Sequence, residues 1–293
     1  DNIEISPLQD YSDIGNAGGL VGNAMADCNV QNTQINNYNM KSNNAGVLGG
    51  LIALSMSNVE VKNTSMKDSN WVIEGYCSND IGGLVGVINS KQSIITNVDL
   101  DNIKFLINRE GGSSICCGGI VGYSREKIDL SDVNMINSEF NIGLGASDVG
   151  GLFGYVAGNS SANNINVVNL PSVGMKSASV AGIIAGYIET IELNNVVIKN
   201  DKILDDETEL YTKIIAGNLY ADAGGLVGFA KNKVIANDII VDKIDIEGQN
   251  SGGIVGKISS SGTFEGENIQ VTNLNVNSNE KAAGIAGYAP NIN

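Results

Sequence analysis

The chain has 293 residues, of which 42 % are hydrophobic and 17 % are charged, which is too apolar and too weakly charged for a disordered protein. No apolar run approaches the roughly 18 to 20 residues of a membrane span. The net charge of −15, without a concentrated basic patch, argues against nucleic acid and an anionic membrane surface as partners, because both require clustered Lys and Arg.

Nine glycine-rich boxes recur along the chain at intervals of roughly 28 to 43 residues. Most read Gly-Gly, then Leu or Ile, then Val, Ile or Phe, then Gly or Ala, and they start at Gly18, Gly49, Gly82, Gly118, Gly150, Ala181, Gly224, Gly252 and Ala283. The boxes that start at Gly49, Ala181 and Ala283 differ by Gly/Ala exchange. Such a period indicates a stacked repeat protein, so residues 1–293 are expected to form a single solenoid.

A second feature follows each of the first eight boxes. It is Asn or Asp before Val or Ile, and it begins at Asn29, Asn58, Asn97, Asp132, Asn164, Asn195, Asp238 and Asn268. Five residues later stands Asn in six of eight cases (Asn63, Asn102, Asn137, Asn169, Asn200 and Asn273), with Gln34 and Lys243 as the exceptions. β-Branched residues alternate between the two members, which is typical of a strand with one buried face.

Together these features predict an all-β fold, a three-sided parallel β-helix of about nine coils, each of roughly 33 residues. One side is the glycine box, the second is the strand between the two Asn corners, and the third follows the second Asn. Parallel crossovers favour a right-handed coil. Identical corner amides are expected to bond to one another along the axis, although sugar or ice binding by these Asn residues is an alternative. The paired Gly residues indicate unusual torsions or close backbone approach, and a phosphate cradle is disfavoured because no helix start follows.

The boxes resemble those of the GLUG-motif family, with Gly-Gly-Leu-Val-Gly standing verbatim at 18–22, 82–86 and 224–228. The resemblance covers nearly the whole chain, from Ala17 to Tyr288. It implies a β-helical scaffold in a bacterial surface protein, such as an adhesin-like protein or the non-catalytic part of an immunoglobulin A-cleaving metallopeptidase. It implies no particular ligand.

The chain contains no His, which removes Ser/His/Asp and Cys/His triads and every His-dependent zinc site, so no catalytic residue, cofactor or metal site is predicted. The four Cys residues (Cys28, Cys77, Cys116 and Cys117) are expected to be buried thiols, with a bridge from Cys77 to Cys116 or Cys117 as the alternative. Carboxylates at Asp99 and Asp101, or at Asp205, Asp206 and Glu207, are weaker candidates for a catalytic pair or a calcium site.

Two irregularities could carry function. Residues 201–211 form an insertion that is expected to project as a surface loop. The residue after the box is often aromatic (Tyr123, Tyr155, Tyr187, Phe229 and Tyr288), and stacking would align these rings into one strip. Alternation places them outside together with Val21, Val85, Phe153 and Val227 if the box Leu faces inward. The strip is then either a protein interface or glycan surface, or is covered by loops of the same chain.

The sequence therefore predicts a non-catalytic, extracellular scaffold or adhesive segment of a larger bacterial surface protein, cell-surface or secreted. A place within a stalk or filament is one option for such a segment. A glycan-binding or glycan-cleaving β-helix is the alternative, and ice binding is disfavoured because no regular Thr array occurs. The expected partner is a host or matrix protein, a cell-surface glycan, or a neighbouring subunit stacked end to end. The chain starts at Asp1 without a signal-like segment, and the ends carry no obvious cap, so we expect a piece of a longer protein or an end-to-end assembly.

Overall fold

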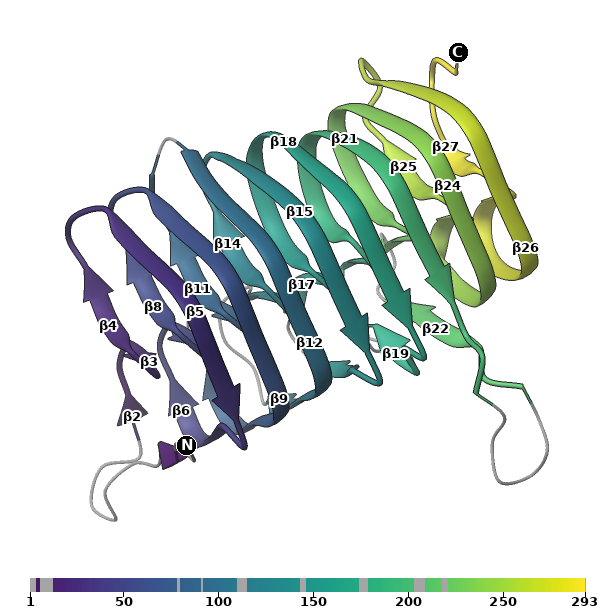
Figure 1. Ribbon diagram of the computed structural model, residues 1–293. Helices are drawn as coiled ribbons and strands as arrows, with labels where there is room; N and C mark the ends of the chain where they lie inside the picture. The colour runs from purple at the N-terminus through teal and green to yellow at the C-terminus, as the bar shows by residue number, and fades with distance from the viewer. Residues whose placement is uncertain are drawn as a thin grey trace.

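The structure is a computed structural model that describes residues 4–5, 13–77, 80–90, 92–109, 115–142, 146–173, 179–202, 209–217 and 221–292. The described chain is all-β, with 77 % of its residues in strands and no helix, and it winds into a parallel β-solenoid of about seven turns (Figure 1). The predicted fold class is confirmed. The predicted count of nine coils is slightly too high, because nine boxes delimit only eight intervals.

Strands occupy recurrent places in the coil. Short strands lead into the boxes: β3 (Ala17–Gly18), β7 (Leu48–Gly49), β10 (Ile81–Gly82), β13 (Ile115–Gly118), β17 (Ala146–Gly150), β20 (Val180–Gly182) and β23 (Asp222–Gly224). Short strands also leave the boxes: β4 (Val21–Ala24), β8 (Ile52–Ser55), β11 (Val85–Ile88), β14 (Val121–Ser124), β25 (Val255–Ile258) and β27 (Ala286–Tyr288).

Long strands cross the face that is nearest the viewer in Figure 1: β5 (Cys28–Asn36), β9 (Val59–Cys77), β12 (Gln92–Arg109), β15 (Lys127–Ile136), β18 (Phe153–Val168), β21 (Ala185–Lys199), β24 (Val227–Gly252) and β26 (Thr263–Ala283). Separate strands complete some coils: β6 (Asn39–Ala45), β16 (Glu139–Ile142), β19 (Ser172–Val173) and β22 (Thr212–Ile215). At the N-terminal end, β1 (Glu4–Ile5) and β2 (Asp13–Ile14) pair with β6.

The glycine box is a sharp bend between two strands rather than one straight side. In the fourth box, β13 ends at Gly118, Gly119 and Ile120 form the bend, and β14 begins at Val121. A Cβ on Gly118 would lie 2.2 Å from the carbonyl oxygen of Val121, so only glycine permits this approach of the two backbones. Close backbone approach, one of the two predicted reasons for the paired Gly residues, is confirmed.

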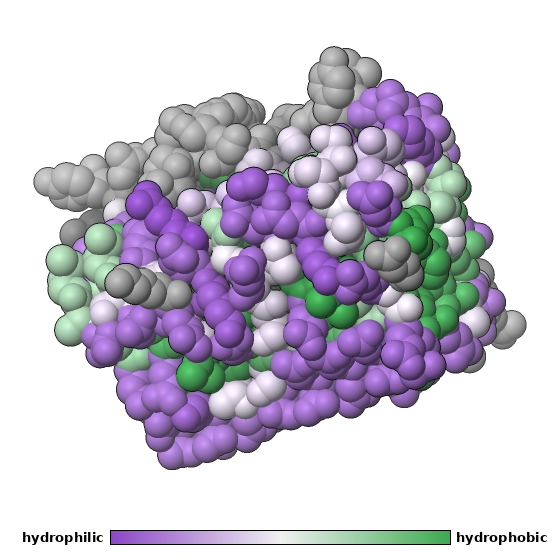
Figure 2. Space-filling view, turned by 90° about the horizontal axis from the view of Figure 1, so that it is seen from above, coloured by the Kyte–Doolittle hydropathy of each residue, from purple (hydrophilic) through white to green (hydrophobic). Residues whose placement is uncertain are grey.

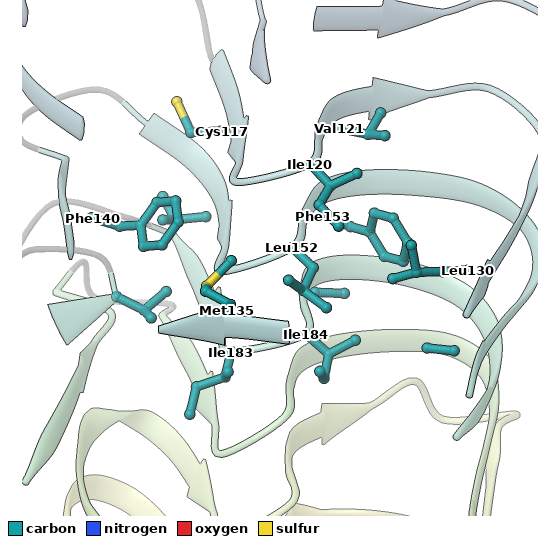
Figure 3. Packing of buried hydrophobic residues seen from close by; sticks show 14 of the residues in the cluster. Cys117, Ile120, Val121, Leu130, Met135, Phe140, Leu152, Phe153, Ile183 and Ile184 are labelled. Carbon is teal, nitrogen blue, oxygen red and sulfur yellow. The ribbon is translucent and has the colours of Figure 1, made fainter. Parts of the chain in front are cut away.

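The bend changes which side chains face the core. Both the box Leu or Ile and the next residue point inward, as Ile120 and Val121, and Leu152 and Phe153, do in Figure 3. The prediction that Val85, Phe153 and Val227 lie outside with the aromatic residues is therefore wrong, since all three are fully buried, and Val21 packs against the same core. Strict alternation fails here because it assumes a continuous strand through the box.

Two corners five residues apart recur within or just after the long strands, and in all but one coil both adopt left-handed backbone torsions. The residues with φ between 48° and 56° are Asn32, Asn37, Asn63, Asp68, Asn97, Asn102, Asp132, Asn137, Asn164, Asn169, Asn195, Asp238, Lys243, Asn268 and Asn273. Asn tolerates this conformation better than other residues that carry a Cβ. The predicted corners are confirmed from the third coil onward, except that Asn200 does not adopt a positive φ.

The predicted register of the corners in the first two coils is wrong. Asn63 aligns with Asn97, because Thr64 pairs with Val98, so Asn63 is a first corner and Asp68 is the second. Likewise Asn32 and Asn37, not Asn29 and Gln34, are the corners of the first coil. The error arose because several Asn residues compete for the role within this Asn-rich segment. The sixth box likewise starts at Gly182 rather than Ala181, because Gly150 pairs with Gly182.

Corner amides bond from coil to coil, as the repeat predicts. Asn63 Nδ2 donates to Asn32 Oδ1 over 3.0 Å, and Asn97 Nδ2 donates to Asn63 Oδ1 over 2.8 Å. Further along the axis, Asn164 donates to Asp132 and Asn195 donates to Asn164. Each bond occupies one amide hydrogen of the donor and one lone pair of the acceptor within the solenoid, which favours the structural interpretation of the corner Asn residues.

A second aromatic stack lies inside the core. Trp71, Phe105 and Phe140 occupy one position in successive coils, and Tyr38 packs against Trp71 from two residues before that position in the preceding coil. Neighbouring ring centroids along this series are 5.3, 4.6 and 5.0 Å apart. All four are buried, and Phe140 projects toward the aliphatic core from its own side of the coil (Figure 3). The four rings therefore belong to the same buried core as the aliphatic box residues.

Cys28 and Cys116 are free thiols, so the alternative of a bridge from Cys77 to Cys116 is wrong. The side chain of Cys77 lies outside the described residues. Within the predicted insertion, residues 203–208 lie outside the described residues, while Leu210 is buried. Hydrophobic residues show at the C-terminal end of the molecule, on the right in Figure 2, where core residues of β26 such as Ile269 and Leu274 are only partly buried.

Candidate functional site

The predicted aromatic strip is present on the outside of the solenoid. Tyr123, Tyr155, Tyr187 and Phe229 pair in register through β14, β18, β21 and β24. Their ring centroids are 4.9, 4.4 and 5.3 Å apart, and the planes of neighbouring rings differ by 19° or less. We call these four residues the outer ladder. Each side chain is half-buried.

Tyr288 belongs to the same row but not to the stack. Phe229 pairs with Lys257, and Lys257 pairs with Tyr288, so a lysine separates the last two aromatic residues. The Lys257 ammonium lies 5.8 Å from the centroid of the Phe229 ring and ends the stack with a cation–π contact. On the N-terminal side the row continues as Val87 and Leu54, which pack with Tyr123.

The geometry of the ladder limits what it can bind. Tyr155 has a ring on each side of it, so both of its faces are covered by its neighbours. Only ring edges and hydroxyl groups remain for a partner, which argues against sugar rings lying flat on the central Tyr residues. Burial, followed by the neighbouring Tyr187 and Tyr123, holds the pKa of Tyr155 above its ordinary range, so its hydroxyl stays protonated and can donate a hydrogen bond.

A second outward row runs beside the ladder, two residues before each box. From coil to coil it contains Val47, Asp80, Cys116, Asp148, Val180, Asp222, Asn250 and Lys281. We call it the acidic row. It was not predicted, although aligning the residues two positions before each box would have shown three Asp residues in one column.

The acidic row and the ladder row face each other across the bend. In the first coil, Asn16 Nδ2 donates to Asn23 Oδ1 over 2.8 Å, which joins the two rows directly. Near the other end, Lys257 Nζ lies 3.6 Å from Asp222 Oδ2. The box glycines between them carry no side chain, so only backbone separates the two rows, and we call this strip the groove. It is hollowed into a pocket near Phe229, Asn250 and Lys257.

Carboxyl groups in this groove have raised pKa values. Burial raises the pKa of Asp148 to about 6, against the hydrogen bonds that it receives from Ser147 Oγ over 2.9 Å and from the Cys116 thiol over 3.5 Å. Burial also raises the pKa of Asp80, whose Oδ1 accepts the backbone N–H of Cys116 over 2.8 Å. Burial and these two carboxylates raise the pKa of the Cys116 thiol well above its ordinary range, which makes it an unreactive thiol.

The carboxylates that the sequence offers as a catalytic pair or a calcium site do not form such a site among the described residues. Asp99 and Asp101 lie on an outward strand face, where Asp101 pairs with Lys67 over 3.4 Å. Asp205, Asp206 and Glu207 lie outside the described residues. Among the described residues, no group of three or more Cys, Asp or Glu side chains is placed to hold a metal ion, and no helix there is long and apolar enough to cross a bilayer.

Comparison with known proteins adds no functional assignment. No protein-family model, curated protein sequence or solved structure matches this chain. The candidate site therefore rests on its own geometry, which is a groove with a stacked aromatic wall and a wall of buried carboxyl and amide groups.

Proposed function

We propose that this chain is a non-catalytic, extracellular scaffold or adhesive segment of a larger bacterial surface protein, which presents the outer ladder to a partner. The resemblance of its boxes to the GLUG motif supports the surface location. The single observation that carries the proposal is the in-register stack of Tyr123, Tyr155, Tyr187 and Phe229 on the outside of the solenoid. Half-buried aromatic edges with protonated hydroxyls suit a protein surface, because they combine apolar contact with directional hydrogen bonding.

The partner is a host-surface or matrix protein in this proposal. A neighbouring copy that stacks end to end is a further partner, which is supported by the partly buried core residues Ile269, Val271 and Leu274 on the last long strand. Rigid stacking of coils through corner amides and core aromatics favours a stalk, since each coil is fixed to the next by bonds that repeat along the axis.

Binding of the purified chain to immobilised matrix proteins and host cells tests the adhesive role. Tyr155→Ala and Phe229→Ala are expected to reduce binding at least tenfold, while Ile240→Ala, which changes an exposed side chain on the long-strand face, leaves binding unchanged. All variants are compared by thermal unfolding so that only folded protein is scored. Equal binding by the ladder variants and the parent would refute the ladder as the adhesive surface.

Glycan binding is a second candidate, and one observation favours it specifically. The groove places buried carboxyl and amide groups of the acidic row opposite aromatic side chains, as in the pairing of Asp222 with Lys257 beside Phe229. Planar polar groups next to aromatic rings are suited to polyhydroxylated ligands. Pull-down on insoluble polysaccharides tests this candidate, and retention of the parent chain by none of them would exclude it.

A further inference from the structure

The two tyrosines at the centre of the outer ladder, Tyr155 and Tyr187, form its tightest contact. Their ring centroids are 4.4 Å apart, their planes differ by 8°, and the residues are opposite one another in β18 and β21. The rings on either side lie farther away, with centroid distances of 4.9 Å from Tyr123 to Tyr155 and 5.3 Å from Tyr187 to Phe229. All four side chains are half-buried, so a soluble reagent reaches the ring edges and the hydroxyl groups.

The hydroxyl groups of this central pair are in contact as well. Each is the side-chain hydrogen-bond partner of the other. Burial raises the pKa of both phenols, and the shared hydrogen bond raises the pKa of Tyr155 further but lowers that of Tyr187, which makes Tyr155 the donor. Because the ring centres and the hydroxyl groups are both close, the ortho carbons beside each hydroxyl-bearing carbon also lie next to one another.

These ortho carbons are the positions at which two tyrosyl radicals couple. The unpaired electron of a phenoxyl radical is shared between the oxygen, the ortho carbons and the para carbon, and in tyrosine the para carbon is already bonded to Cβ. The ring centres of two directly joined phenols are about as far apart as those of Tyr155 and Tyr187. Coupling therefore requires the rings to turn about their side-chain bonds, of which the terminal one is soft, with little movement of the backbone.

We propose that Tyr155 and Tyr187 form a dityrosine site, at which a haem peroxidase and hydrogen peroxide join two neighbouring coils covalently. Each phenol gives up one electron and one proton, and hydrogen peroxide takes up both electrons and both protons to become two molecules of water. The two radicals form a C–C bond between ortho carbons, and the hydrogen atoms on those carbons move to the oxygens, which restores both phenols. The reaction needs no bound partner, so the site stands apart from adhesion through the ladder.

Treatment of the purified chain with a haem peroxidase and hydrogen peroxide tests the site. The treated chain should gain dityrosine fluorescence, keep the mass of a single chain less two hydrogen atoms, and yield a cross-linked pair of proteolytic peptides that contains Tyr155 and Tyr187. Tyr155→Phe leaves no two neighbouring tyrosines in the ladder, so the fluorescence and the cross-linked pair should be lost. Tyr123→Phe leaves the central pair intact and should leave the yield unchanged. Both variants keep the stacked rings, so both should fold.

Three results would overturn the assignment: no peptide pair that joins Tyr155 to Tyr187 in the treated parent, cross-links between separate chains only, or dityrosine fluorescence that Tyr155→Phe leaves unchanged. The parent treated with hydrogen peroxide alone is the control for oxidation without the peroxidase. Attachment of the untreated parent to matrix proteins is a separate measurement, so failure of the adhesive role and failure of the cross-link are distinguishable.

Discussion

Tyr155 stacks on Tyr187 with ring centroids 4.4 Å apart and planes only 8° from parallel, although the two residues belong to different coils. Tyr155 and Tyr187 are opposite one another in neighbouring parallel strands, so the coil spacing alone brings their rings into van der Waals contact. The ladder is therefore part of the fold as well as a candidate surface, and its stability effect can be measured separately from binding.

Tyr155→Ala should destabilise the protein by about 2–4 kcal/mol, because it removes a half-buried ring and two stacking contacts, each worth about 0.5–1.5 kcal/mol. Tyr155→Phe keeps both contacts and should cost less than about 1 kcal/mol. Urea unfolding followed by circular dichroism measures the difference. Similar losses for the Phe and Ala variants would mean that the hydroxyl, not the stack, supplies the stability.

The corner residue Asn164 has a left-handed φ of 56° and makes two side-chain hydrogen bonds to neighbouring coils. Its amide donates to Asp132 Oδ1 and accepts from Asn195 Nδ2. Asn164→Ala should cost about 2–4 kcal/mol, since it loses both bonds and places an ordinary residue in the left-handed region. Asn164→Gly loses the same bonds without the torsional penalty, so it should cost about 1–2 kcal/mol. Chemical denaturation distinguishes them, and equal effects would show that torsional strain contributes nothing at this corner.

The second glycine of the box can be tested with a matched pair from adjacent coils. A Cβ on Gly253 would lie 2.1 Å from the carbonyl oxygen of Gly284, whereas a Cβ on Gly284 meets nothing within 4 Å. Gly253→Ala should therefore cost about 1–3 kcal/mol, and Gly284→Ala should change stability by less than about 0.5 kcal/mol. Thermal unfolding measures the stability of the two variants against the parent. A Gly253→Ala variant as stable as the parent would contradict the close approach of Gly253 to the backbone of Gly284.

The sixth box shows how the fold accommodates a larger residue at this position. Ile183 replaces the second glycine, and its N–H lies 3.4 Å from the carbonyl oxygen of Gly225, compared with 3.0 Å for the bond from Gly119 to Gly151. A small widening of the coil contact thus admits a side chain. This is why we expect Gly253→Ala to weaken the solenoid rather than prevent folding.

Much of the fold was predictable because each coil repeats the same physical requirements. Glycine is needed at the bend and Asn at the left-handed corners, so their recurrence defined the coil length and the position of the aromatic strip. Prediction failed where one residue type served several roles, as with Asn58 and Asn63 in the second coil, because composition alone does not say which Asn carries the positive φ.

The candidate site was only half predictable. Tyr123, Tyr155 and Tyr187 stood out because they are large and follow the box directly. The opposing wall was missed because Asp80, Cys116 and Asp148 look like unrelated residues until the bend is known to turn them toward the ladder. A bend that sends two successive box residues inward is a tertiary property, and neither strand alternation nor the glycine pattern specifies it.

The pH dependence of stability tests the burial of Asp148. Its pKa rises from an ordinary value near 3.8 to about 6 in the folded protein, so between these pH values the folded state holds more protons than the unfolded state. Stability should accordingly fall as pH rises from about 4 to about 6, by at most about 3 kcal/mol, and less to the extent that partial exposure screens the charge. Asp80, Cys116 and Tyr187 lie close to this carboxyl, and all three stay the same when Asp148 alone is substituted.

Asp148→Asn replaces the carboxyl with a neutral group of the same shape, so it should reduce this decline, to which the buried Asp80 and Asp222 also contribute. It should also raise the Tm above that of the parent at pH 7, provided that Ser147 and Cys116 keep a hydrogen-bonding partner. Asp99→Asn, on an exposed strand face, serves as the control and should leave the pH profile unchanged. Thermal unfolding between pH 4 and pH 7 measures all three proteins. A parent profile that rises over this interval, or one that Asp148→Asn leaves unaltered, would show that Asp148 ionises in the folded groove as readily as in water.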